Sequence, residues 1–142
     1  MNKKNVKLWI IKGMYILGIV LDGFCAIEMF TGAIMKDQSP FLGFAYSILG
    51  GGPIYQYVMF IAASFMLGWT LLLVWGLFKP IERKEVLLIT WLPVVIGLGI
   101  SHFIAYSYGI YIVSDLVIRA TINGFLNIGL VVSYILARSL KK

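Results

Sequence analysis

Four long apolar stretches constrain this chain more than any other feature. They lie at about residues 8–35, 57–78, 86–106 and 110–137. A helix rises about 1.5 Å per residue, so about 20 apolar residues cross the hydrocarbon core of a bilayer. Only 13% of the residues are charged, whereas a soluble domain has about 25%. The sequence therefore predicts an all-α membrane protein, a four-helix transmembrane bundle that occupies residues 1–142 as one domain.

The basic residues predict how this bundle is oriented. Most of them precede the first stretch, lie between the second and third, or follow the fourth: Lys3, Lys4, Lys7, Lys12, Lys79, Arg83, Lys84, Arg138, Lys141 and Lys142. The other two connections contain only Lys36, which stands beside Asp37. By the positive-inside rule, both termini and the central connection lie in the cytoplasm. We therefore expect a multi-pass protein of the cytoplasmic (inner) membrane.

The first outer connection is longer than a turn and has its own pattern. Ser39-Pro40 is typical of a helix start, and residues 41–49 are apolar until a run of three glycines and Pro53. This predicts a short extracytoplasmic helix that lies on the membrane interface between spans one and two. A segment that dips into the bundle and acts as a gate is the alternative.

A polar stripe runs through the last apolar stretch. Asp115, Arg119, Asn123 and Asn127 recur every four residues, so on a helix they lie on nearly the same face. An arginine near the bilayer centre costs about 2.5–3.5 kcal/mol on insertion scales. The stripe is therefore expected to face other protein or a water-filled cavity rather than lipid.

Depth in the membrane brings polar residues of three spans to similar levels. With the predicted orientation, Glu28, His102 and Arg119 share one level in the outer half. Asp22 and Asn123 share a deeper level. This predicts one ligand- or proton-binding site, with these candidates: Asp22, Glu28, His102, Asp115, Arg119, Asn123 and Asn127. Because Asp22 and Glu28 are about 120° apart on a helix, Asp22 is the better candidate for the bundle interior.

Structural roles for the same residues stay open beside this prediction. Asp115 and Arg119 are four residues apart, the spacing at which opposite charges on one helix form an ion pair. Asn123 and Asn127 have the chemistry to hydrogen-bond across helices. A lone histidine such as His102 is also common as a packing residue.

Several chemistries lack the residues they need. Cys25 is the single cysteine, so there is no intramolecular disulfide and no C-x-x-C pair. One histidine is too few for a zinc site or for a haem held by two histidines of one chain. No P-loop, glycine-rich dinucleotide turn or nucleophile–base motif is present. We therefore expect no metal and no cofactor, and the basic residues at the span ends do not indicate nucleic-acid binding.

These observations predict a small polytopic protein that binds or transports a small molecule or an ion through a polar site in its outer half. A non-catalytic membrane subunit or accessory protein is one alternative. An intramembrane acid–base enzyme that acts on a lipid-like substrate is another, but non-enzymatic roles are favoured. The expected partners are the lipid bilayer, a second copy or another membrane protein, and a small-molecule ligand.

One short segment resembles a known family. The stretch Ala26-Ile27-Glu28-Met29, ending at Met35-Lys36, is similar to the first span of small multidrug resistance transporters, which are four-span proteins with a lone carboxylate there. The resemblance implies a transport mechanism centred on Glu28. It covers residues 26–36 only, and the long first connection, Arg119 and the strong charge bias depart from that family.

Overall fold

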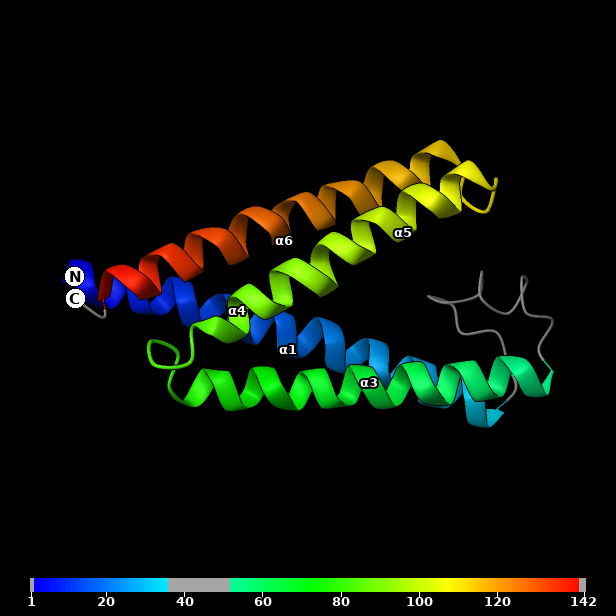
Figure 1. The fold of residues 1–142 in the computed structure, drawn as a ribbon, viewed down its shortest axis with the longest axis horizontal. Helices are drawn as coiled ribbons and strands as arrows, with labels where there is room; N and C mark the ends of the chain where they lie inside the picture. The colour runs from blue at the N-terminus through cyan, green and yellow to red at the C-terminus, as the bar shows by residue number, and fades with distance from the viewer. Residues whose placement is uncertain (1, 36–51, 141–142) are drawn as a thin grey trace. The chain divides into compact units, whose positions relative to one another are not determined.

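The computed structural model describes residues 2–35 and 52–140 (Figure 1). Of these residues 89% are helical, and they include no strand. In chain order the elements are α1 (Lys3–Met35), α3 (Pro53–Phe78), α4 (Glu85–Ile89), η1 (Thr90–Val95), α5 (Ile96–Ser107) and α6 (Val113–Leu140). The all-α prediction is therefore confirmed for the part of the chain that the structure describes.

Four helical segments are long and apolar enough to cross a membrane, as the sequence predicts. They are Lys3–Ile34, Pro53–Phe78, Glu85–Ser107, which joins α4, η1 and α5, and Val113–Leu140. The orientation of the termini stays a prediction, and the short helix or gate expected at 41–49 lies outside the described residues.

The last span begins at Val113, three residues later than expected, because a turn precedes it. Gly109 in this turn has φ of 71°, a left-handed conformation that glycine adopts without a steric penalty.

The chain forms two compact units. One contains residues 1–15 and 76–142, and the other contains residues 16–75. The expectation of a single domain stays a prediction.

The unit of residues 16–75 is an antiparallel pair made by the C-terminal part of α1 and by α3 (Figure 1). At one end Gly18 admits the side chain of Leu73, since a Cβ at Gly18 would lie 3.0 Å from Leu73 Cδ1. At the other end Gln56 Nε2 donates a 3.0 Å hydrogen bond to the Ala33 carbonyl. A small buried cluster fills the contact near this end: Ala33, Tyr55 and Met59, with Met29 against them. Small residues allow the two backbones to approach closely.

The other unit is built around α6, with α4, η1 and α5 antiparallel beside it (Figure 1). The first turns of α1 belong to this unit and pack on the C-terminal half of α6, where Met14 covers Gly129 and Lys7 Nζ donates to Ser139 Oγ at 3.1 Å. Tyr15 is fully buried, and its hydroxyl donates a 2.8 Å hydrogen bond to the Arg83 carbonyl. These contacts fix the connection between α3 and α4 against the start of α1.

The third span contains a π-helix, η1, around Pro93. Proline has no backbone N–H, and its ring crowds the carbonyl four residues earlier in a regular α-helix. A wider turn relieves that crowding, and single π turns within α-helices are a known response to such strain and occur often at functional sites. In this structure the widened turn comprises six residues, Thr90–Val95.

Candidate functional site

A pocket of about 320 Å³ lies between α5 and α6. It is lined by Gly99, His102, Phe103, Leu116, Ala120, Asn123 and Gly124. The lining is mostly apolar, and its polar side chains are His102 from α5 and Asn123 from α6. A mostly apolar hollow with few convergent polar groups is the usual form of a small-molecule site.

Asn123 is held in place by hydrogen bonds from both sides. Its Nδ2 donates to the Val95 carbonyl at 2.8 Å, and its Oδ1 accepts from Asn127 Nδ2 at 2.7 Å. The Asn127 Oδ1 in turn accepts from the indole Nε1 of Trp91 at 2.8 Å. The two asparagines therefore join α6 to η1, and the cross-helix role that the sequence left open for them is present in the structure.

Gly99 gives the Asn123 amide room against α5. A Cβ at position 99 would lie 3.1 Å from Asn123 Oδ1, which is tighter than an ordinary contact. The hydrogen bonds and the glycine together place one fixed amide at the wall of the pocket.

His102 lines the same pocket as this amide. Its ring contacts the Tyr111 ring, with centroids 6.0 Å apart. Within residues 2–35 and 52–140, the His102 imidazole makes no hydrogen bond. An imidazole carries a donor and an acceptor, or two donors when charged. His102 therefore lines the pocket with a hydrogen-bonding capacity that the described residues do not use.

Tyr111 links His102 to Arg119. The Arg119 guanidinium carbon lies 4.6 Å from the centroid of the Tyr111 ring, which is cation–π geometry. Tyr111 lies in the turn before α6 and is buried. Burial raises the pKa of the Tyr111 phenol above its ordinary value, the positive charge of Arg119 opposes that rise, and the negative charge of Asp115 adds to it. Arg119 is thus compensated in part by an aromatic face.

Four of the predicted site residues come together in this unit. His102, Arg119, Asn123 and Asn127 lie along the α5–α6 contact, joined by Tyr111 or by hydrogen bonds. Asp115 is exposed in the first turn of α6 and makes no ion pair within the described part of the chain.

The two remaining candidates, Asp22 and Glu28, are half-buried on α1 in the unit of residues 16–75. Their convergence with the residues on α5 and α6 stays a prediction.

Sequence reasoning missed two residues of the site, Trp91 and Tyr111. An indole N–H in an apolar span needs an acceptor, which was a usable signal for Trp91, but the acceptor lies 36 residues away. Tyr111 follows the irregular turn at Gly109, so no helical spacing relates it to Arg119.

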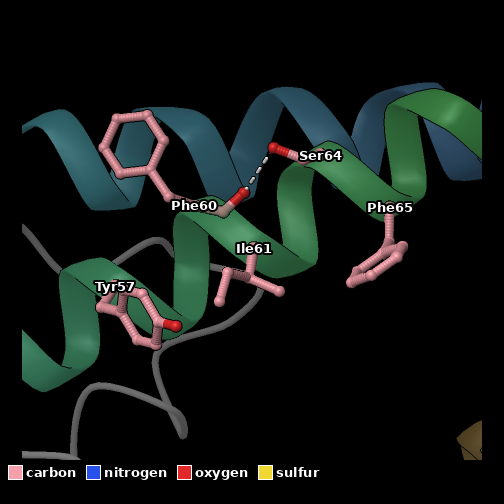
Figure 2. Close-up of a pocket in the computed structure, with 5 residues that line it drawn as sticks. All are labelled: Tyr57, Phe60, Ile61, Ser64 and Phe65. Carbon is pink, nitrogen blue, oxygen red and sulfur yellow. Dashed lines mark hydrogen bonds between the residues drawn. The ribbon is translucent and has the colours of Figure 1, made fainter.

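A second hollow, of about 520 Å³, lies along one helix, α3 (Figure 2). It is lined by Tyr57, Phe60, Ile61, Ser64 and Phe65. The Ser64 hydroxyl donates to the Phe60 carbonyl at 2.8 Å, within its own helix (Figure 2). This hollow is therefore an apolar helix surface rather than a site with polar groups directed at a ligand.

No group of three or more His, Cys, Asp or Glu side chains with metal-binding geometry occurs among the described residues. Comparison of the chain with protein-family models, with curated proteins and with solved structures found no match.

Proposed function

We propose that this protein is an integral membrane protein that binds a small, mainly apolar ligand with one hydrogen-bonding group in the α5–α6 pocket. The observation that carries the proposal is His102: it lines the pocket together with the fixed amide of Asn123, and it has no hydrogen bond within the described residues. Four apolar helices support the membrane setting.

The lining of the pocket indicates the chemistry of the ligand. Phe103, Leu116 and Ala120 favour a hydrocarbon body. His102 and Asn123 favour a single polar group such as a hydroxyl, carbonyl or amide, which both side chains can hydrogen-bond. The lining residues include no carboxylate, so the pocket favours recognition of such a ligand over acid–base chemistry by a histidine–carboxylate pair.

Native mass spectrometry of protein extracted gently from its own membranes tests this proposal. We expect a reproducible mass that is not a membrane phospholipid, and we expect His102→Ala to lose it. Ser101→Ala is the matched control, because Ser101 is exposed on the same helix and donates to the Leu98 carbonyl of its own helix. The same bound mass in wild type and His102→Ala would overturn the proposal, as would wild type without any bound mass.

A chemical probe gives an independent readout, because His102 is the single histidine of the chain. Diethyl pyrocarbonate acylates imidazole nitrogen, and peptide mass spectrometry reports the adduct. We expect slow acylation of His102 in freshly extracted protein and at least about tenfold faster acylation after the ligand is removed. Equal rates before and after removal would contradict an occupied pocket. Transport of the recovered compound would then be measured as flux into vesicles that contain the protein.

A non-catalytic membrane subunit is the second candidate function. The observation that favours it is that Asn123 and Asn127 form hydrogen bonds to the neighbouring helix, with Val95 and Trp91. This alternative predicts that purification without detergent exchange retains a protein partner, and that His102→Ala leaves that assembly intact.

A further inference from the structure

The first two turns of α1 carry three cations and no acid. Lys3, Lys4 and Lys7 lie there, and no acidic residue occupies the first turn. Cations at a helix N-terminus are disfavoured by the helix dipole, and Lys3 and Lys7 are like charges one turn apart. The arrangement is therefore unfavourable for the isolated helix, and an external anion would relieve it.

The end of α6 adds a fourth cation to this place. Lys7 Nζ donates to Ser139 Oγ at 3.1 Å, which joins the start of α1 to the last turn of α6, where Arg138 lies (Figure 1). Lys3, Lys4 and Arg138 are exposed, and Lys7 is half-buried. We call Lys3, Lys4, Lys7, Arg138 and Ser139 the terminal basic patch.

The acidic side chains of the same unit either pair with cations outside the terminal basic patch or lie far from it. Glu82 pairs with Lys79 at 3.1 Å, and Glu85 pairs with Lys84 at 2.7 Å. Asp115 is 23 residues before Arg138 on α6, which is about 35 Å along the helix. Within the described part of the chain, no cation of the terminal basic patch forms an ion pair with a carboxylate.

We propose that the terminal basic patch binds the headgroup phosphate of anionic phospholipids. The patch stands where two candidate spans end, Lys3–Ile34 and Val113–Leu140, so its side chains are at the depth of lipid headgroups. Ammonium, guanidinium and hydroxyl donors suit phosphate oxygens. Basic clusters next to a membrane span attract anionic lipids electrostatically. The site is separate from the α5–α6 pocket and does not depend on the ligand proposed there.

The test uses the full-length protein in a neutral detergent with added phosphatidylglycerol or phosphatidylcholine. Native mass spectrometry counts retained lipids, and the midpoint of thermal unfolding reports the stabilisation that binding confers. We expect phosphatidylglycerol to be retained and to raise the midpoint more than phosphatidylcholine does. We expect Lys7→Gln combined with Arg138→Gln to weaken phosphatidylglycerol binding by about tenfold or more. Lys7→Arg should preserve binding, because it keeps the charge and the donor.

A charge-matched control separates a site from general attraction. Lys12→Gln combined with Lys79→Gln also removes two cations, but both lie outside the patch, and Lys79 already pairs with Glu82. An equal loss of phosphatidylglycerol in this control would overturn the proposal. Equal retention of the two lipids by wild type would overturn it as well. Equal stabilisation by inorganic phosphate at the same concentration would show that the patch takes free anions, and would overturn the lipid assignment.

Discussion

The indole N–H of Trp91 donates a 2.8 Å hydrogen bond to the side-chain oxygen of Asn127, across the contact between η1 and α6. Asn127 passes this constraint to Asn123 through its own amide N–H groups, at 2.7 Å to Oδ1 and 2.8 Å to the backbone carbonyl. The wall of the candidate ligand pocket is therefore fixed by a tryptophan that does not line it.

Asn127→Ala should remove the hydrogen bond from Trp91 to Asn127 and the hydrogen bonds from Asn127 to Asn123. We expect a loss of about 1–2 kcal/mol in the free energy of unfolding, since the half-buried Trp91 indole loses its acceptor and the Asn123 oxygens lose their donor. Reversible unfolding in mixed micelles measures it. Thr121→Ala is the control, because Thr121 is exposed on the same helix and donates to its own Val117 carbonyl. A double-mutant cycle with Trp91→Phe should give a coupling energy of about 0.5–1.5 kcal/mol; independent effects would show that the bond contributes nothing.

Gly99→Ala and Gly97→Ala make the same chemical change at two positions that differ in the free space around the glycine. A Cβ at position 99 would lie 3.1 Å from Asn123 Oδ1, whereas a Cβ at position 97 would meet nothing within 4 Å. We expect Gly99→Ala to displace the amide and reduce retention of the pocket ligand. Gly97→Ala should retain the ligand and match or slightly exceed wild-type stability, because alanine favours helix by roughly 1 kcal/mol. Native mass spectra measure how much ligand each variant retains. Equal retention in the two variants would contradict the role of the Asn123 amide in the pocket.

Gly76→Ala should destabilise the connection between α3 and α4. A Cβ at position 76 would lie 2.5 Å from Tyr15 Cε1, and the Tyr15 ring is buried and anchored by its hydrogen bond to the Arg83 carbonyl. We expect overpacking to lower the free energy of unfolding by about 1–3 kcal/mol. Gly68→Ala, which meets nothing within 4 Å on the same helix, should be neutral. Similar unfolding midpoints for the two variants would argue against this contact.

Tyr111 should ionise at higher pH than a free tyrosine, because burial raises its pKa. The difference in ultraviolet absorbance between wild type and Tyr111→Phe isolates its titration. Its folded pKa lies above the ordinary value of about 10, so its contribution to stability is complete below that pH and is lost as pH rises through the folded pKa. Arg119→Gln should raise the pKa further, and Asp115→Asn should lower it, since these charges act in opposite directions. A titration at the ordinary value in the folded protein would contradict the burial of the phenol.

The sequence predicted the features that follow from composition and local spacing. Four spans follow from the length of the apolar stretches, and the cross-helix bonds of Asn123 and Asn127 follow from the expense of burying an amide in an apolar helix. It did not predict Tyr111 as the partner of His102 and Arg119, because an irregular turn sets that contact. The convergence of Asp22 and Glu28 with this site rests on depth alone and stays a prediction.

The π-helix at Pro93 has a consequence for the helical phase of the third span. A π turn accommodates about one residue more than an α turn, and one residue corresponds to about 100° of rotation around an α-helix. A helical wheel drawn from Val86 therefore points Gly99 and His102 away from the direction they take in the protein. Deleting one residue within Thr90–Val95 would restore regular winding and leave the span long enough for a bilayer. It would also rotate His102 from the pocket toward another side of α5. The number of residues between Thr90 and Val95 therefore sets which way the His102 side chain points.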